Sequence, residues 1–154
     1  MNYTDGQMSW IEDVIEFRGH KSIRATHKTT FEITTDHHLT ENGDCIVGVG
    51  ASKGCSQLDE RVRSLIMRSD PIVKILIEFH GHQFSAQAKG NPDLTLDDSD
   101  EIVIRKSSFT SPRTLAILCN KAAIDIPRAM VKDLQDPGKV GKLRICVEND
   151  RWSA

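Results

Sequence analysis

The sequence lacks the features that mark membrane and secreted proteins. No apolar run approaches the roughly 20 residues that a membrane helix needs. The four cysteines are scattered without a C-x-x-C pair, and residues 1–9 lack the charged and apolar blocks of a signal peptide. Aromatic residues make up only 5% of the chain, and 20 basic residues against 22 acidic ones give a net charge of −2. We therefore expect a cytoplasmic protein with reduced thiols, a flexible tail over residues 1–9, no membrane association and no strongly cationic surface overall.

What the sequence does contain is a pattern that occurs twice. EFRGH at residues 16–20 returns as EFHGH at 78–82. The segment SKGCSQLDERVRSLI (52–66) lies against NKAAIDIPRAMVKDL (120–134), which aligns Lys53 with Lys121. The shared order of turns and apolar positions predicts two internal repeats, about residues 12–79 and 76–149, within a single domain over 1–154.

Strands dominate each predicted repeat. Period-two alternation predicts a long strand over 22–34, bent near residues 27–29, with its odd positions facing the core. Further strands are expected after an Asn-Gly turn at 42–43 and at 72–79, 82–89, 101–106, 113–119 and 142–148. Helical spacing predicts one short helix per repeat, about 57–67 and 125–135. The predicted fold is mainly β (α+β), a compact β-sandwich or closed β-barrel built from two pseudo-symmetric repeats.

The segment RATHKTTFEITTDHHLTENGDC (24–45) holds three of the six histidines. Its spacing does not match a zinc site, so neither a metal nor a cofactor is expected. His37 and His38 follow the strand and are expected in solvent. His27 lies on the apolar face, either as a core histidine with a hydrogen-bond partner or as a base lining a pocket. In an enzyme, His27 would act as the base with Asp44 or His20 assisting.

Two other segments carry basic residues that favour anion binding. GVGASKGCSQL runs from a strand through a glycine-rich loop to a helix, with Lys53 beside the helix start, and Lys121 occupies the matching position in the second repeat. IRKSSFTSPRT (104–114) places Arg105, Lys106 and Arg113 around Phe109. A tight turn and a solvated hairpin are the structural alternatives for these two segments.

Two longer segments together resemble a known family. They are GHKSIRATHKTTFEITTDHHLTENGDCIVGVGASKG and IVIRKSSFTSPRTLAILCNKAAIDIPRAMV. They are similar to the archaeal domain of unknown function 371 family, over about residues 15–148. The resemblance implies an archaeal cytoplasmic protein of mainly β structure, of sandwich or barrel type, and it implies no activity.

These residues are compatible with three functions. The first is a binding module for an anionic or phosphate-bearing ligand or RNA, using His20, His27, Lys53, Arg105, Lys106, Arg113 and Lys121. The second is a hydrolase-like or metal-dependent enzyme that uses His27 with Asp44 or His20. The third is a structural or assembly protein without a small ligand, and a homodimer is left open. Binding is favoured over catalysis because no nucleophile, base and orienting group stand together in the sequence.

Overall fold

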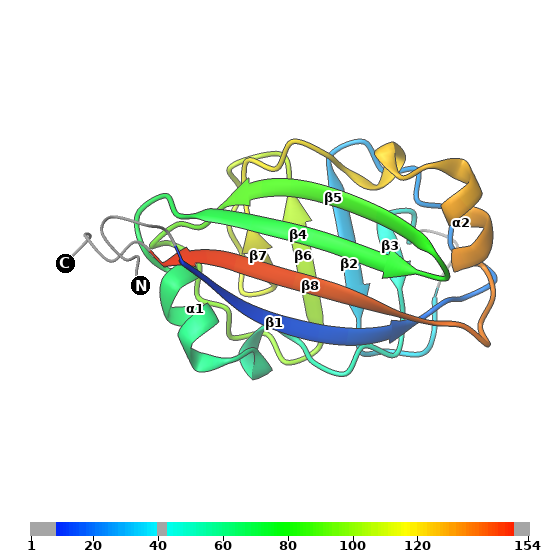
Figure 1. Ribbon diagram of the computed structural model, residues 1–154, viewed down its shortest axis with the longest axis horizontal. Helices are drawn as coiled ribbons and strands as arrows, with labels where there is room; N and C mark the ends of the chain where they lie inside the picture. Colours follow the sequence, from blue (N-terminus) through cyan, green and yellow to red (C-terminus); the bar gives the residue numbers. More distant parts are fainter. Residues whose placement is uncertain (1–8, 40–42, 150–154) are drawn as a thin grey trace.

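The computed structural model describes residues 9–39 and 43–149 (Figure 1). Most of the predicted tail over 1–9 therefore lies outside the described residues, and so does Asn42 of the predicted turn. Within the described ranges, no helix has the length and apolar character needed to span a membrane.

The elements follow the same order twice along the chain. The first series is β1 (Ser9–Arg18), β2 (Thr30–Thr34), β3 (Ile46–Gly48), the 3-10 turn η1 (Cys55–Gln57), α1 (Glu60–Ile66) and β4 (Ile72–Phe79). The second series is β5 (His82–Lys89), β6 (Glu101–Arg105), β7 (Thr114–Ala116), η2 (Ala123–Asp125), α2 (Arg128–Leu134) and β8 (Val140–Asn149).

The strands form two four-stranded sheets, one in front of the other in Figure 1. The front sheet has the order β1-β8-β4-β5 and is antiparallel throughout. The rear sheet has the order β3-β2-β6-β7, with an antiparallel pair in the middle and a parallel strand on each side. Each sheet therefore places one strand from each series at its centre.

The closed barrel, one of the two predicted alternatives, is wrong for the described residues. The order of each sheet ends in two different strands that do not pair with each other, so neither sheet closes on itself. One apolar cluster contains side chains from both sheets and both helices. Phe31 of β2 meets Phe84 of β5 edge to face, with ring centroids 5.8 Å apart, and this contact joins the two sheets.

The predicted strand over 22–34 is shorter in the structure, because only Thr30–Thr34 forms β2. Ala25 has φ of 51°, a left-handed conformation that interrupts an extended strand. The N–H groups of Thr26 and His27 donate to the carbonyl oxygen of Asp44 instead of to a neighbouring strand. Ile23, Ala25, Phe31 and Ile33 are buried as predicted, and His27 is half-buried.

The even positions of β2 are also buried, which the prediction of a solvated outer face did not anticipate. Thr30, Glu32 and Thr34 lie on the face of the rear sheet that points away from the core, and each is less than a tenth exposed. The predicted helices are present at the expected places, although α1 and α2 are each seven residues long and follow a 3-10 turn.

Candidate functional site

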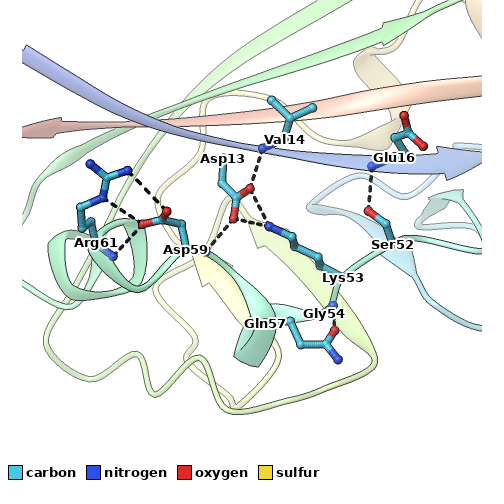
Figure 2. Close-up of polar contacts among 9 residues, drawn as sticks. All are labelled: Asp13, Val14, Glu16, Ser52, Lys53, Gly54, Gln57, Asp59 and Arg61. Carbon is cyan, nitrogen blue, oxygen red and sulfur yellow. Dashed lines mark hydrogen bonds and ion pairs between the residues drawn. The ribbon is translucent and has the colours of Figure 1, made fainter.

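The glycine-rich loop around Lys53 is held in place by a buried carboxylate (Figure 2). The Lys53 Nζ lies 2.9 and 3.1 Å from the two carboxylate oxygens of Asp13, which is 8% exposed. Asp13 also accepts hydrogen bonds from the backbone N–H of Val14 at 2.8 Å and of Asp59 at 2.7 Å. Lys53 thus pairs with a carboxylate of β1 that also accepts a hydrogen bond from Asp59, the N-cap residue of α1.

Lys121 has the matching place beside β5 but a different neighbour. Ser52 makes two hydrogen bonds to the edge of β1. Its backbone N–H donates to the carbonyl oxygen of Glu16, and its Oγ accepts from the backbone N–H of Glu16. On β5, Asn120 makes the same two bonds to Gln87. Lys121 follows Asn120 as Lys53 follows Ser52, so the two lysines occupy equivalent places against their strands.

The residues on β1 and β5 explain why the two lysines differ. Counting along the strands from the matched positions aligns Asp13 with Phe84, and the Lys121 Nζ lies 5.2 Å from the centroid of the Phe84 ring. In the same alignment, every carboxylate of this stretch of β1 corresponds to an uncharged side chain on β5. Glu12 aligns with Gln83, Asp13 with Phe84 and Glu16 with Gln87. The surroundings of Lys121 therefore lack the negative charge that neutralises Lys53.

A pocket of about 490 Å³ lies where Lys121 meets the front sheet. Its lining residues come from β4, β5, β8 and the segment after β7: Lys74, Ile75, Leu76, Ser85, Ala86, Gln87, Asn120, Lys121 and Cys146. None of these carries a carboxylate. Neither lysine forms an ion pair with any residue in the described part of the chain. The pocket thus combines two lysines with residues that carry hydroxyl and amide groups.

The predicted basic segment 104–114 is folded against the outer face of the rear sheet. The Arg113 Nη1 lies 2.6 Å from Glu101 Oε1 and 3.9 Å from Glu32 Oε2. Arg105 donates to Thr114 Oγ1 at 2.9 Å and to Ser111 Oγ at 3.3 Å. The Lys106 Nζ lies 3.8 Å from Asp125 Oδ2.

Glu32 is a buried carboxylate that the sequence interpretation missed. Its pKa rises from 4.5 to about 7, first because burial disfavours the charged form and then because Glu101 lies beside it. The Cys45 Sγ donates to Glu32 Oε1 at 3.4 Å, and burial raises the pKa of this thiol to about 12, so it is a poor nucleophile at neutral pH. Glu32 is only 4% exposed, so little of its carboxyl group is open to a ligand.

The two predicted site histidines, His20 and His27, have separate hydrogen-bond partners. His27 and Asp44 meet through the backbone, and the His27 Nδ1 accepts from the Thr29 N–H at 3.2 Å. The His20 Nδ1 accepts from the Ser22 N–H at 3.0 Å, and within the described residues no hydrogen bond joins His20 to His27 or Asp44. His37 and His38 are exposed.

Fold and site together define a mainly β protein of two sheets with a lysine-lined pocket. The chain belongs to the family described as "Domain of unknown function (DUF371)", which it matches over residues 15–148. It is 40% identical over 126 residues to a protein of the archaeon Methanocaldococcus jannaschii that is named only as uncharacterised. The alignment covers 82% of this chain and 93% of that relative.

Proposed function

We propose that this protein binds a small anionic ligand, of the phosphate-bearing class, in the pocket lined by Lys74 and Lys121. The observation that carries the proposal is the contrast between two equivalent lysines. Lys53 is neutralised by Asp13, whereas Lys121 and Lys74 line one pocket without a carboxylate. A lysine that has no carboxylate partner leaves its charge available to an anionic ligand.

The other lining groups suit an organic phosphate better than a bare ion. Asn120 uses its Oδ1 on the backbone of β5, which leaves its amide NH₂ as a donor toward the pocket, beside the hydroxyl of Ser85. Leu76 and Ala86 supply apolar surface for the uncharged part of a ligand. A phosphate held by the lysines and a carbon skeleton against the apolar residues would use every kind of group in the pocket.

The proposal is tested by titrating inorganic phosphate and a nucleoside monophosphate while following backbone amide resonances. We expect shifts at Ser85, Gln87 and Asn120, with tighter binding of the nucleotide. Lys74→Gln and Lys121→Gln should each weaken binding by about ten- to a hundredfold, the usual range for one charge-assisted hydrogen bond.

Lys142→Gln is the matched control, because Lys142 is an exposed lysine on the same face of the front sheet but outside this pocket. It removes the same charge and should change the affinity less than twofold. Absence of binding by both probes would overturn the proposal. So would an equal loss in Lys142→Gln and Lys121→Gln, because that result assigns the effect to net charge alone.

We also infer that the chain is a single domain of sandwich type that arose by duplication of one unit, as the internal repeats at about 12–79 and 76–149 suggest. The repeated series of elements supports this, and so do the paired edge bonds of Ser52 and Asn120. The alignment of EFRGH with EFHGH does not fit this inference. EFRGH lies at the end of β1 and EFHGH at the turn between β4 and β5, which are different places in the series. On this history, the second copy acquired the pocket when its edge strand lost its carboxylates.

A further inference from the structure

Phe109 is the most exposed large apolar side chain among the described residues, at 60%. It lies in the loop between β6 and β7. An exposed phenyl ring costs free energy in water, and this ring is held in place rather than left to move. Its backbone N–H donates to Ser107 Oγ at 3.3 Å. The Arg105 guanidinium carbon lies 4.9 Å from its ring centroid.

Arg105 is in turn fixed by two hydroxyl groups. Its Nε donates to Thr114 Oγ1 and its Nη2 to Ser111 Oγ, and these two hydroxyl oxygens are 2.8 Å apart. Thr114 is fully buried, so the guanidinium is attached to a rigid part of the rear sheet. One face of the Phe109 ring is therefore backed by a planar cation. We call the group of Arg105, Phe109, Ser111 and Thr114 the aromatic platform.

Basic side chains lie beside the aromatic platform, and two of them also pair with carboxylates, Arg113 with Glu101 and Lys106 with Asp125. Burial and the neighbouring Arg113 lower the pKa of Arg105, which reflects two guanidinium groups close together. Arg113 is itself 45% exposed. The backbone N–H of Lys106, the residue after Arg105, donates to the carbonyl oxygen of Thr29. Lys28 precedes Thr29 and is exposed, so it lies one residue from this contact. An anion beside Arg105 and Arg113 reduces their mutual repulsion.

From this geometry we propose that the aromatic platform is a binding surface for single-stranded nucleic acid. One unpaired base stacks on the open face of Phe109, and the adjoining phosphates contact Arg105, Arg113 and Lys28. Stacking on a fixed aromatic ring with basic groups beside it is how proteins hold single strands without reading their sequence. The ring projects from a short loop, which suits an unpaired base and not the paired bases of a duplex. A purely apolar protein partner would cover the Arg105 guanidinium, which forms no ion pair with any of the described residues, without supplying a counter-charge.

The test uses the full chain and three fluorescein-labelled probes of about a dozen nucleotides, in anisotropy titrations between roughly 50 and 200 mM salt. The probes are oligouridine, oligothymidine and a mixed-sequence duplex. We expect both single strands to bind and the duplex to bind at least about tenfold more weakly, since it offers no free base to stack. Two or three phosphate contacts predict a slope of log affinity against log salt of about −1.4 to −2.1.

Phe109→Ala should weaken single-strand binding by about five- to 150-fold, the range for loss of one stacked base. Trp10→Ala is the matched control. Trp10 is also an exposed aromatic residue with a cation over its ring, Lys74 at 4.4 Å, but it belongs to the front sheet. Its substitution should leave the affinity unchanged.

Three results would overturn the proposal. One is no binding of either strand at the lowest salt concentration. Another is equal affinity for the duplex, and the third is an equal loss in Trp10→Ala and Phe109→Ala. Because Phe109 makes little contact with the core, circular dichroism should give the same melting temperature for the variant and the parent, which separates loss of binding from loss of fold.

Discussion

Stability should depend on the protonation of Glu32, and the change Glu32→Gln isolates that dependence. The folded state raises the pKa of this carboxyl from 4.5 to about 7, so the folded protein binds the proton more tightly than the unfolded chain does. The stabilisation that this proton supplies is complete below the unfolded pKa and is lost as the pH rises through the folded pKa. A shift of this size corresponds to about 3 kcal/mol.

Glutamine has nearly the same size as glutamate and stays uncharged across this window. The free energy of unfolding is measured by urea denaturation of both proteins between about pH 4.5 and pH 8. In the difference between them, the titrating groups that do not interact with Glu32 cancel. We expect the parent to lose about 3 kcal/mol relative to Glu32→Gln over this range. Glu101→Gln removes the neighbouring charge and should reduce the slope without abolishing it. A difference between parent and Glu32→Gln that stays constant with pH would refute the reasoning.

Two further predictions concern the front sheet. Asp13→Asn should destabilise the protein by about 1–3 kcal/mol, because the buried carboxylate that binds Lys53 and the Asp59 N–H would be replaced by an uncharged group; a thermal melt within about 1 °C of the parent would contradict this. Gly141→Ala should lower the free energy of unfolding, measured in urea, by about 1–3 kcal/mol. The added Cβ would lie 2.4 Å from Phe79 Cδ1 and 2.9 Å from Phe17 Cζ, which is closer than packed atoms can approach. Gly138→Ala, whose Cβ would lie 3.3 Å from Asp136 Oδ1, is the tolerant control.

Strands with an uninterrupted alternation could be predicted from the sequence. The expected ranges 72–79 and 82–89 coincide with β4 and β5, whose inward positions carry only apolar residues apart from the strand end at His82. The first strand was not recognised as a unit, because Asp13 stands at an inward position among Ile11, Ile15 and Phe17. Alternation cannot reveal a buried ion pair whose second member comes from a loop 40 residues away.

The candidate sites show the same limit. The sequence located Lys121 and the segment 104–114, because basic residues beside loops and aromatic residues are visible in one dimension. It did not reveal Lys74 as a partner of Lys121, since that pair depends on β4 lying beside β5 and on the segment after β7 crossing the sheet edge. Glu32 was assigned to solvent by parity alone, and only the loops covering the rear sheet make it buried.

The position of β8 between β1 and β4 decides when the front sheet can form. Ser9 and Asn149 bond to each other although they are 140 positions apart. β1 has no other partner strand in this sheet, so its edge on that side stays open until nearly all of the described chain has been synthesised. Pairing of such distant segments is slow, because a long loop must close before any contact forms. During translation the first series of elements is therefore complete in sequence but exposes an open strand edge, and this nascent chain is the form most open to capture by chaperones or by a second copy.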